Sequence, residues 1–208
     1  MTPRERELSR RRLLELGLAL PPLAYLAARG DLLADVAAAA SAPLALTPEI
    51  VDADDPTPAQ SEGPFFTPRS PLRRSIAPAG APGTRLTLTG RVLTTSGRPI
   101  PRALLDFWQA DSRGLYDNSG YRFRGHQRSD SRGRYALQTV VPGLYSGRTR
   151  HIHVKAQAPR GRVLTTQLYF PAEARNQEDA LFDPELLVRR WRRAGGRRVA
   201  SFDFVLSA

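Results

Sequence analysis

Two of the three histidines in this 208-residue chain lie one residue apart, in Arg150-His151-Ile152-His153-Val154. The apolar residues around them predict a β-strand, and side chains at positions i and i+2 of a strand point to the same face. Two tyrosines lie upstream in glycine-containing turns, Tyr116 after Gly-Leu and Tyr145 after Pro-Gly-Leu. If these turns present both tyrosines to the same point, two imidazole nitrogens and two phenol oxygens can share one metal ion.

Phenol ligands favour a hard metal of high charge. A free phenol has a pKa of about 10 and gives up its proton only to a strong Lewis acid; Fe(III) is such an acid. A ferric site with two phenolates would withdraw electron density from a bound substrate and let O2 attack that substrate. Each residue also has a plainer interpretation, since His-x-His is more often structural and each tyrosine can be an ordinary core residue. The third histidine, His126, has no paired ligand nearby, and we assign it to a loop or to the surroundings of the site.

The composition removes several other classes of site. The chain has no cysteine, which excludes disulfides, zinc–thiolate sites, iron–sulfur clusters and thiol nucleophiles. Its net charge is +11, and Lys155 is the only lysine among 31 basic residues. The arginines are scattered and lack an aromatic platform, so we predict no nucleic-acid partner. One arginine cluster, at 189–193 with Arg197 and Arg198, could form a local anion patch.

The N-terminal segment resembles a twin-arginine export signal, with Ser9-Arg10-Arg11-Arg12-Leu13-Leu14 at its start. The apolar stretch that follows is interrupted by Pro21-Pro22 and is shorter than the roughly 20 residues of a membrane span, so we predict no stable span. We predict an export signal over residues 1–42 and a periplasmic or extracellular protein. The alternative is an amphipathic N-terminal helix that stays on the protein.

The rest of the chain indicates an extended arm followed by a β domain. Residues 43–84 are rich in Pro, Ala and Thr and have few periodic runs, which predicts an N-terminal arm. Over residues 85–208 short alternating segments are separated by glycine and proline, so we predict an all-β domain, an antiparallel β-sandwich of about seven strands. One helical stretch is predicted over residues 177–193, although it contains Pro184. The predicted strands cover residues 85–93, 103–110, 121–130, 133–140, 150–157, 162–170 and 199–206.

Several motifs together resemble the intradiol ring-cleavage dioxygenases, the family that includes catechol and protocatechuate 3,4-dioxygenases. The resemblance covers residues 60–185. The motifs that carry it are Glu62-Gly63-Pro64-Phe65-Phe66, Asp106-Phe107-Trp108-Gln109-Ala110, Gly114-Leu115-Tyr116, Pro142-Gly143-Leu144-Tyr145, Arg148, His151-Ile152-His153 and Leu164-Thr165-Thr166-Gln167.

The resemblance implies a sandwich that holds a non-haem Fe(III) centre. It implies a reaction of O2 with a catechol-type diol, in which the ring is cleaved between the two hydroxyl-bearing carbons to a muconate-type diacid. The metal ligands that it implies are Tyr116, Tyr145, His151 and His153. The catalytic residues that it implies are Arg148, Gln167 and, in a second role as a base, Tyr145. The substrate-lining positions that it implies are Trp108, Pro64 and Gly147.

The chain departs from the well-known enzymes of that family in one segment. Only five residues separate Tyr145 from His151, fewer than in those enzymes, and the long dimerisation helix of catechol dioxygenases has no counterpart. This compact segment resembles the small, secreted, single-chain branch of the family. A short loop should open the pocket, so the sequence leaves open which catechol is the substrate. It also leaves open whether two copies form a homodimer.

Three alternatives stay open at the level of sequence. The sandwich could be a metal- or catechol-binding module without turnover. It could be a transthyretin-like domain without metal, in which His151 and His153 fill a pocket. It could hold Zn²⁺ or Fe(II) through these two histidines and an aspartate, Asp106 or Asp117. For Arg148, the alternative to a catalytic role is a salt bridge to a nearby carboxylate.

Overall fold

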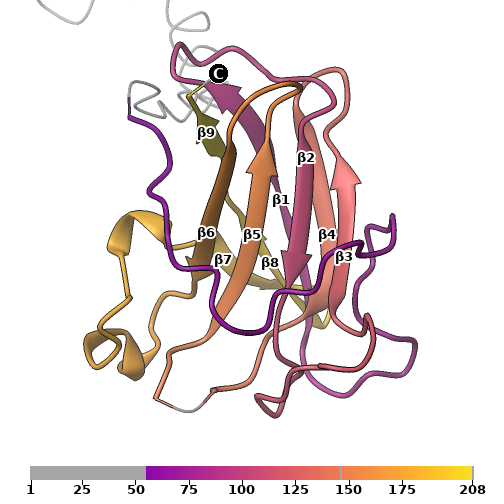
Figure 1. Cartoon of the computed structure of the whole chain (residues 1–208). Helices are drawn as coiled ribbons and strands as arrows, with labels where there is room; N and C mark the ends of the chain where they lie inside the picture. Colours follow the sequence, from indigo (N-terminus) through magenta and orange to yellow (C-terminus); the bar gives the residue numbers. More distant parts are fainter. Residues whose placement is uncertain (1–54, 146, 208) are drawn as a thin grey trace, which may run out of the picture. The chain divides into compact units, whose positions relative to one another are not determined.

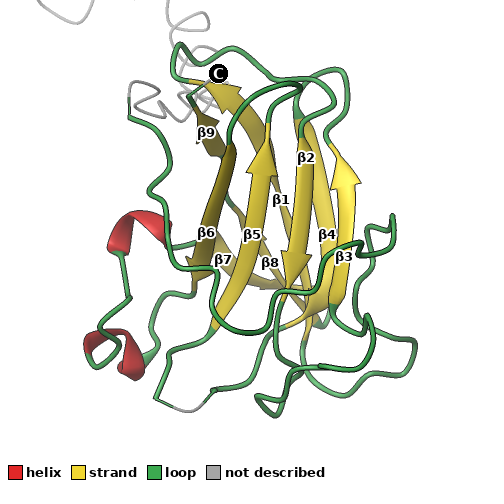
Figure 2. Ribbon diagram, in the orientation of Figure 1, coloured by secondary structure: helices red, strands yellow, loops and turns green. Residues whose placement is uncertain are grey.

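Two β-sheets packed face to face form the body of the protein (Figure 1 and Figure 2). The computed structural model describes residues 55–145 and 147–207, so the predicted export signal over residues 1–42 lies outside the described residues. In the first sheet the strand order is β4 (Arg134–Val140), β1 (Arg85–Thr94), β8 (Arg197–Ser201) and β7 (Arg189–Ala194), with β9 (Phe204–Leu206) also paired to β1. In the second sheet the order is β3 (Arg124–Arg128), β2 (Leu104–Trp108), β5 (His151–Gln157) and β6 (Val163–Tyr169). The predicted β-sandwich is therefore confirmed.

Apolar side chains from both sheets fill the space between them. Leu88 of β1 and Ile152 and Val154 of β5 are fully buried in one cluster. Strand alternation places His151 and His153 on the opposite face of β5. These two histidines are nonetheless only 4% and 3% exposed. Strand β5 is thus buried on both faces, and something other than the apolar core must cover the histidine side.

The six strands predicted between residues 85 and 170 are confirmed as β1 to β6, with ends shifted by at most three residues. The helix predicted over residues 177–193 is wrong. After the 3-10 helix η2 (Ala174–Gln177), this stretch holds the one-turn 3-10 helix η3 (Pro184–Leu186) and then strand β7. A proline inside a helix has no N–H to donate and its ring clashes with the preceding turn, so Pro184 can only start a new turn. Within residues 55–145 and 147–207, no helix has the length and apolarity needed to cross a membrane.

The last predicted strand, over residues 199–206, is in fact two strands, β8 and β9. The break between them lies where the chain passes very close to β1. A Cβ added to Gly90 of β1 would lie only 1.7 Å from the Phe202 carbonyl oxygen. The Asp203 side chain then accepts a hydrogen bond from the Arg91 backbone N–H, at 2.6 Å. Both strands run parallel to β1, so the first sheet is mixed. The prediction of an entirely antiparallel sandwich is therefore wrong for this sheet.

The described part of the N-terminal arm, residues 55–84, covers the second sheet. In Figure 1 its indigo trace descends beside β6 and then crosses the ends of β5 and β2 toward β3. Backbone hydrogen bonds attach it to β6 through Gln60 and to β3 through Arg73. Between these two attachments, Glu62 forms an ion pair with Lys155 of β5. The arm is therefore fastened to the sheet on both sides of the two histidines.

Leu88→Ala tests the packing of the core at its centre. Leu88 is fully buried and lies between β4 and β8. Removal of its side chain leaves a cavity, so we expect the free energy of unfolding, measured by urea denaturation, to fall by about 3 kcal/mol. The control is Leu72→Ala, at a residue that is 71% exposed; it should change the value by less than about 0.5 kcal/mol. A loss at Leu88 as small as that of the control would contradict the packing described.

Candidate metal centre

The predicted site residues meet at one end of the second sheet. Strand β2 ends there at Trp108, and the antiparallel strand β5 begins there at His151 (Figure 1). The loop that follows β2 carries Tyr116, and the loop that precedes β5 carries Tyr145. Strand pairing and the two loops thus bring together residues from three separate parts of the chain.

The two histidines and one tyrosine have their polar atoms within hydrogen-bonding distance. Tyr116 Oη lies 3.2 Å from His151 Nε2 and 3.1 Å from His153 Nε2. The second tyrosine, Tyr145, packs edge-on against Tyr116, with ring centroids 5.7 Å apart. Atoms bound to one metal at about 2 Å lie about 3 Å from their neighbours in the shell. The spacing of the first three donor atoms therefore fits a shared ion.

The hydrogen bonds of His151 determine which of its nitrogens is free. Its Nδ1 lies 2.7 Å from the backbone carbonyl oxygen of Thr149. Since a carbonyl can only accept, the proton is on Nδ1 and the lone pair of Nε2 faces Tyr116. Burial lowers the pKa of His151 to about 4, so the ring is neutral at neutral pH. A neutral imidazole whose other nitrogen is fixed by a carbonyl is the form that binds a metal.

His153 is held by an aromatic ring behind it. Trp108 stacks on its imidazole with ring centroids 4.8 Å apart and planes 6° from parallel, and Phe66 packs on the Trp108 ring at 4.9 Å. Burial, and then the neighbouring His151, lower the pKa of His153 well below its ordinary value. Its Nδ1 is buried without a hydrogen-bond partner among the described residues. Trp108 is only 1% exposed, so it supports the His153 ring from behind.

Tyr116 is a phenol in this environment. Burial raises its pKa above the ordinary value, and the guanidinium groups of Arg148 and Arg124 oppose this only in part. Tyr116 Oη would therefore lose its proton only beside a cation that attracts the phenolate more strongly than these two guanidinium groups do. A bound multivalent metal is such a cation, so the environment of Tyr116 fits a strongly Lewis-acidic ion.

The N-terminal arm closes the site from one side. The Phe65 ring stacks on Tyr116 with centroids 4.4 Å apart and lies edge-on to Tyr145 at 5.3 Å. Gly63 passes so close to His153 that a Cβ on it would lie 3.3 Å from Cε1 of the ring. Its φ of +70° also favours glycine. The arm is therefore in contact with three of the four predicted ligands.

Arg124, which no sequence motif marked, fixes both the arm and the loop that carries Tyr116. It is the first residue of β3 and is 1% exposed. Its guanidinium donates to the carbonyl oxygen of Asp117, at 2.8 and 3.1 Å, and to that of Phe65, at 2.5 Å. Because Asp117 follows Tyr116 and Phe65 stacks on it, Arg124 sets the position of this tyrosine from two sides.

Arg148 lies beside the ligand cluster in a network of partly buried polar groups. Its Nε donates to the Asp179 carboxylate at 2.9 Å, and its Nη2 donates to Gln167 Oε1 at 2.7 Å. The Gln167 side chain donates in turn to the carbonyl oxygen of Ser61 in the arm, at 2.8 Å. The predicted catalytic residues Arg148 and Gln167 are thus in contact with each other. The salt bridge weighed as the alternative for Arg148 is also present.

Asp179 is the acceptor at the centre of this network, and it lies in the segment that was predicted to be helical. Its carboxylate also accepts hydrogen bonds from the backbone N–H groups of Thr149, at 2.9 Å, and Leu181, at 3.0 Å. Burial acts to raise the pKa of Asp179, but these hydrogen bonds and Arg148 together hold it below its ordinary value. Asp179 therefore stays ionised and fixes both Arg148 and the backbone that leads into His151.

The segment before Arg148 leaves one side of the site open. Gly147 is exposed, and no heavy atom outside its own neighbourhood lies within 4 Å of the position that a Cβ would take. Pro64 of the arm is exposed as well. Of the three predicted substrate contacts, Pro64 and Gly147 thus reach the surface, whereas Trp108 lies behind a histidine.

The alternative sites with an aspartate are not assembled. Asp106 accepts a hydrogen bond from Ser70 at 2.7 Å, next to His126, and Asp117 accepts from backbone N–H groups of its own loop. His126 lies on β3 and not in a loop. Among residues 55–145 and 147–207, no three His, Cys, Asp or Glu side chains gather closely enough to hold a metal ion. The tyrosine–histidine group is the donor set that fits one.

Comparison with known proteins identifies the family. The family model Dioxygenase_C, described as "Dioxygenase", matches residues 61–208. The chain belongs to the intradiol ring-cleavage dioxygenase family. It is 30% identical to catechol 1,2-dioxygenase 2 of Acinetobacter lwoffii, over 61% of this chain and 55% of that protein, so it spans about half the length of that relative. It is also 30% identical to hydroxyquinol 1,2-dioxygenase of Nocardioides simplex, over 85% of this chain and 72% of that protein.

Solved structures of the family superpose on the sandwich. The dioxygenase domain of a dioxygenase carbohydrate-binding protein fusion from Streptomyces sp. SirexAA-E is 57% identical, with a TM-score of 0.72, covering 74% of this chain and 99% of that one. Catechol 1,2-dioxygenase from Pseudomonas arvilla C-1 is 26% identical, with a TM-score of 0.64, covering 73% of this chain and 62% of that one. The family typically uses Fe(III), which agrees with the tyrosine–histidine donor set described above.

Asp179→Asn tests the anchor of Arg148. The aspartate offers two oxygens to the N–H groups of Arg148, Thr149 and Leu181, whereas an asparagine offers one oxygen and points its amide hydrogens at the remaining donors. The partly buried Arg148 guanidinium also loses its counter-charge. We expect the free energy of unfolding to fall by about 3 kcal/mol in urea denaturation.

Asp130→Asn is a matched control for this variant. Asp130 also accepts from the side chain of an arginine, Arg134, and from two backbone N–H groups, but it lies at the surface. Solvent screens an exposed pair, so this variant should leave the unfolding midpoint almost unchanged. Equal effects of the two variants would show that Asp179 is not a buried anchor.

Proposed function

We propose that the protein is a non-haem Fe(III) intradiol dioxygenase. It inserts both atoms of O2 into a catechol-type diol and cleaves the ring between the two hydroxyl-bearing carbons, giving a muconate-type diacid. The observation that carries this proposal is the convergence of Tyr116, His151 and His153 on one point, with Tyr145 packed beside them. The family to which the chain belongs supports the same reaction class.

The metal would be held by Tyr116, Tyr145, His151 and His153. When bound, Fe(III) supplies a Lewis acid that draws electron density from the diol and makes its ring reactive toward O2. The protein contributes neutral imidazoles that are already oriented, one by the Thr149 carbonyl and the other by the Trp108 ring. It also keeps water away from three of the ligands by means of the arm.

The two tyrosines differ in freedom, and this difference assigns their roles. Tyr116 is stacked under Phe65 and its loop is held by Arg124, so it stays in place as a ligand. Tyr145 is only half-buried and lies two residues from the exposed Gly147. Tyr145 Oη is therefore the group that can turn away and accept a proton from an incoming diol hydroxyl.

Arg148 provides a fixed positive charge beside the bound diol. A guanidinium cannot lose its proton in a protein, so it stabilises the negative charge that develops on the diol oxygens. Its orientation comes from Asp179 on one side and from Gln167 on the other. Gln167, which is also bonded to the arm, positions Arg148 relative to the cover of the site.

The open side near Gly147 and Pro64 gives room for a ring that carries further substituents, so the substrates are proposed to include substituted catechols. We further propose that residues 1–42 direct export, which would make this a periplasmic or extracellular enzyme. The 99% coverage of the Streptomyces dioxygenase domain supports a compact dioxygenase domain of similar size in this chain.

The metal assignment predicts a coloured protein. Ferric phenolate absorbs strongly in the visible range, so iron-loaded protein should be reddish and elemental analysis should find one iron per chain. Tyr116→Phe and Tyr145→Phe should each shift or remove the visible band. Tyr121→Phe is the control, because its hydroxyl bonds to the Pro68 carbonyl at the surface; its spectrum should match the wild type. Another element in the loaded protein, or unchanged spectra in both tyrosine variants, would rule out the ligand set.

The reaction itself is tested with an oxygen electrode over a panel of substituted catechols. We expect one O2 consumed per diol, and both oxygen atoms in a diacid product. Arg148→Gln should lower kcat by about a hundredfold while the visible band stays, because a charge beside the substrate is lost and the ligands are not. Arg132→Gln, in an exposed turn, is the control. Coloured protein that binds catechols without oxygen uptake would identify a binding module instead.

A further inference from the structure

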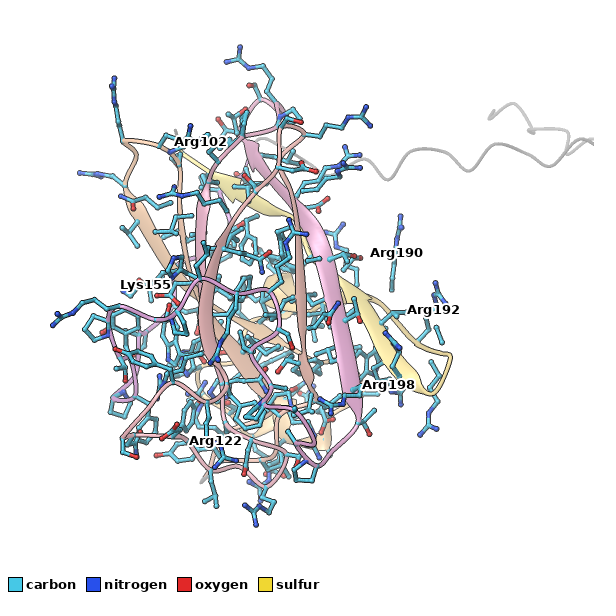
Figure 3. All side chains as sticks on the ribbon, turned by 90° about the vertical axis from the view of Figure 1, so that its right-hand side faces the viewer. Arg102, Arg122, Lys155, Arg190, Arg192 and Arg198 are labelled. Carbon is cyan, nitrogen blue, oxygen red and sulfur yellow. The ribbon has the colours of Figure 1, made fainter. Side chains whose placement is uncertain are left out.

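A second cluster of cations lies away from the metal centre, on the ribbon formed by β7 and β8. The segment 189–198 carries six arginines and no acidic residue. Figure 3 shows three of its side chains, Arg190, Arg192 and Arg198, along one side of the molecule. Among the described residues, no ion pair involves Arg192, Arg193, Arg197 or Arg198.

Arg193 and Arg198 lie directly opposite one another in the pairing of β7 with β8. Residues in this relation point to the same face with Cβ atoms about 5 Å apart, and like charges there repel each other. Neither arginine forms an ion pair with a carboxylate of the described residues. An oxyanion that accepts hydrogen bonds from both guanidinium groups would convert the repulsion into a favourable interaction.

The same two side chains line a hollow of about 310 Å³. Trp191 forms part of its wall, and the Arg198 guanidinium lies 4.8 Å from the centroid of the Trp191 ring. Phe170 packs against Trp191 with centroids 5.1 Å apart. Arg198 is therefore held in place over a rigid aromatic surface, and the hollow has the size of a small-molecule site.

A third guanidinium reaches this hollow from the second sheet. Arg150, just before β5, is oriented by an ion pair with Glu173 at 2.9 Å and by a hydrogen bond to the Pro142 carbonyl oxygen at 2.6 Å. Three guanidinium groups thus face one carboxylate, and the excess charge is positive. None of the four proposed metal ligands lines the hollow, so it is separate from the metal centre.

Protection of a sheet edge does not explain this arrangement. Exposed charges on an edge strand prevent pairing with other chains, and Arg192 on the edge strand β7 serves that purpose. Arg198 lies on β8, which has neighbours on both sides, and Arg150 lies in the loop just before β5 of the other sheet. Neither can protect an edge.

We propose that this hollow is a second ligand site, which binds a small molecule through an oxyanion group held between Arg193 and Arg198. Arg150 offers a further positive charge to a second acidic group on the same molecule. A dicarboxylate and a phosphate ester share this chemistry. The proposal does not depend on the reaction proposed above, because none of the residues involved is a metal ligand.

The experiment is a calorimetric titration of the full-length, iron-loaded protein at low ionic strength with inorganic phosphate and, separately, with cis,cis-muconate. Both probes should bind with saturation, and the binding that depends on Arg193 and Arg198 should leave the visible band unchanged, since these residues do not line the metal centre. Arg193→Gln and Arg198→Gln should each weaken binding roughly tenfold or more through loss of a charge-assisted hydrogen bond. Thermal unfolding of each variant checks that the fold is kept.

Arg102→Gln is the matched control. It removes the same charge from the end of the molecule away from the ribbon (Figure 3) and should leave both affinities unchanged. Tighter binding of phosphate would indicate a phosphate ester as ligand, tighter binding of muconate a dicarboxylate, and either supports the site. Equal weakening in all three variants, or absence of saturable binding of both probes, would overturn it. If the metal assignment is wrong, the visible band will be missing, but the two probes will still bind to the hollow.

Discussion

The burial of strand β5 on both faces is the constraint on which the rest of the structure depends. One face joins the apolar core, and the other carries two imidazoles that are almost fully removed from solvent. Buried polar groups are costly unless they have partners. The chain therefore brings Tyr116, the Thr149 carbonyl and the arm to this face. The same demand explains why an otherwise plain sandwich has a long extended segment across one sheet.

Two guanidinium groups hold the covering segments in place, each in a different way. Arg124 uses only carbonyl oxygens and joins the arm to the loop of Tyr116. Arg148 uses the ionised Asp179 and joins the chain after β6 to the start of β5. Both connect segments that are far apart in sequence. The side of the site near Gly147 has no such connection, and it is the side that stays open to a ligand.

The sequence predicted those features whose signal is local. Alternation gave the strands, and the two-residue spacing of His151 and His153 gave a shared face. Asp179 was not predicted, because its role comes from the fold that brings it to Arg148 and not from any neighbour in sequence. Arg124 was not predicted either, since one arginine in a chain with so many carries little information. The mixed first sheet also escaped prediction, because parallel pairing depends on the close approach of the chain at Gly90.

The positions of basic side chains with and without a carboxylate partner affect how the diol substrate and the diacid product approach and leave the protein. Arg148 and Lys155 are each paired with a carboxylate, whereas no ion pair among the described residues includes Arg193 or Arg198. An aromatic diol is neutral near pH 7, so the positive charge of Arg124 and Arg148 does not hinder its entry, and its protons are lost only on binding. A diacid product is a dianion. Arg193 and Arg198 attract such an ion over about 8 Å, the distance over which salt screens charge at physiological ionic strength. The cationic hollow lined by Arg150, Arg193 and Arg198 thus acts on the product side of the proposed reaction rather than at the metal.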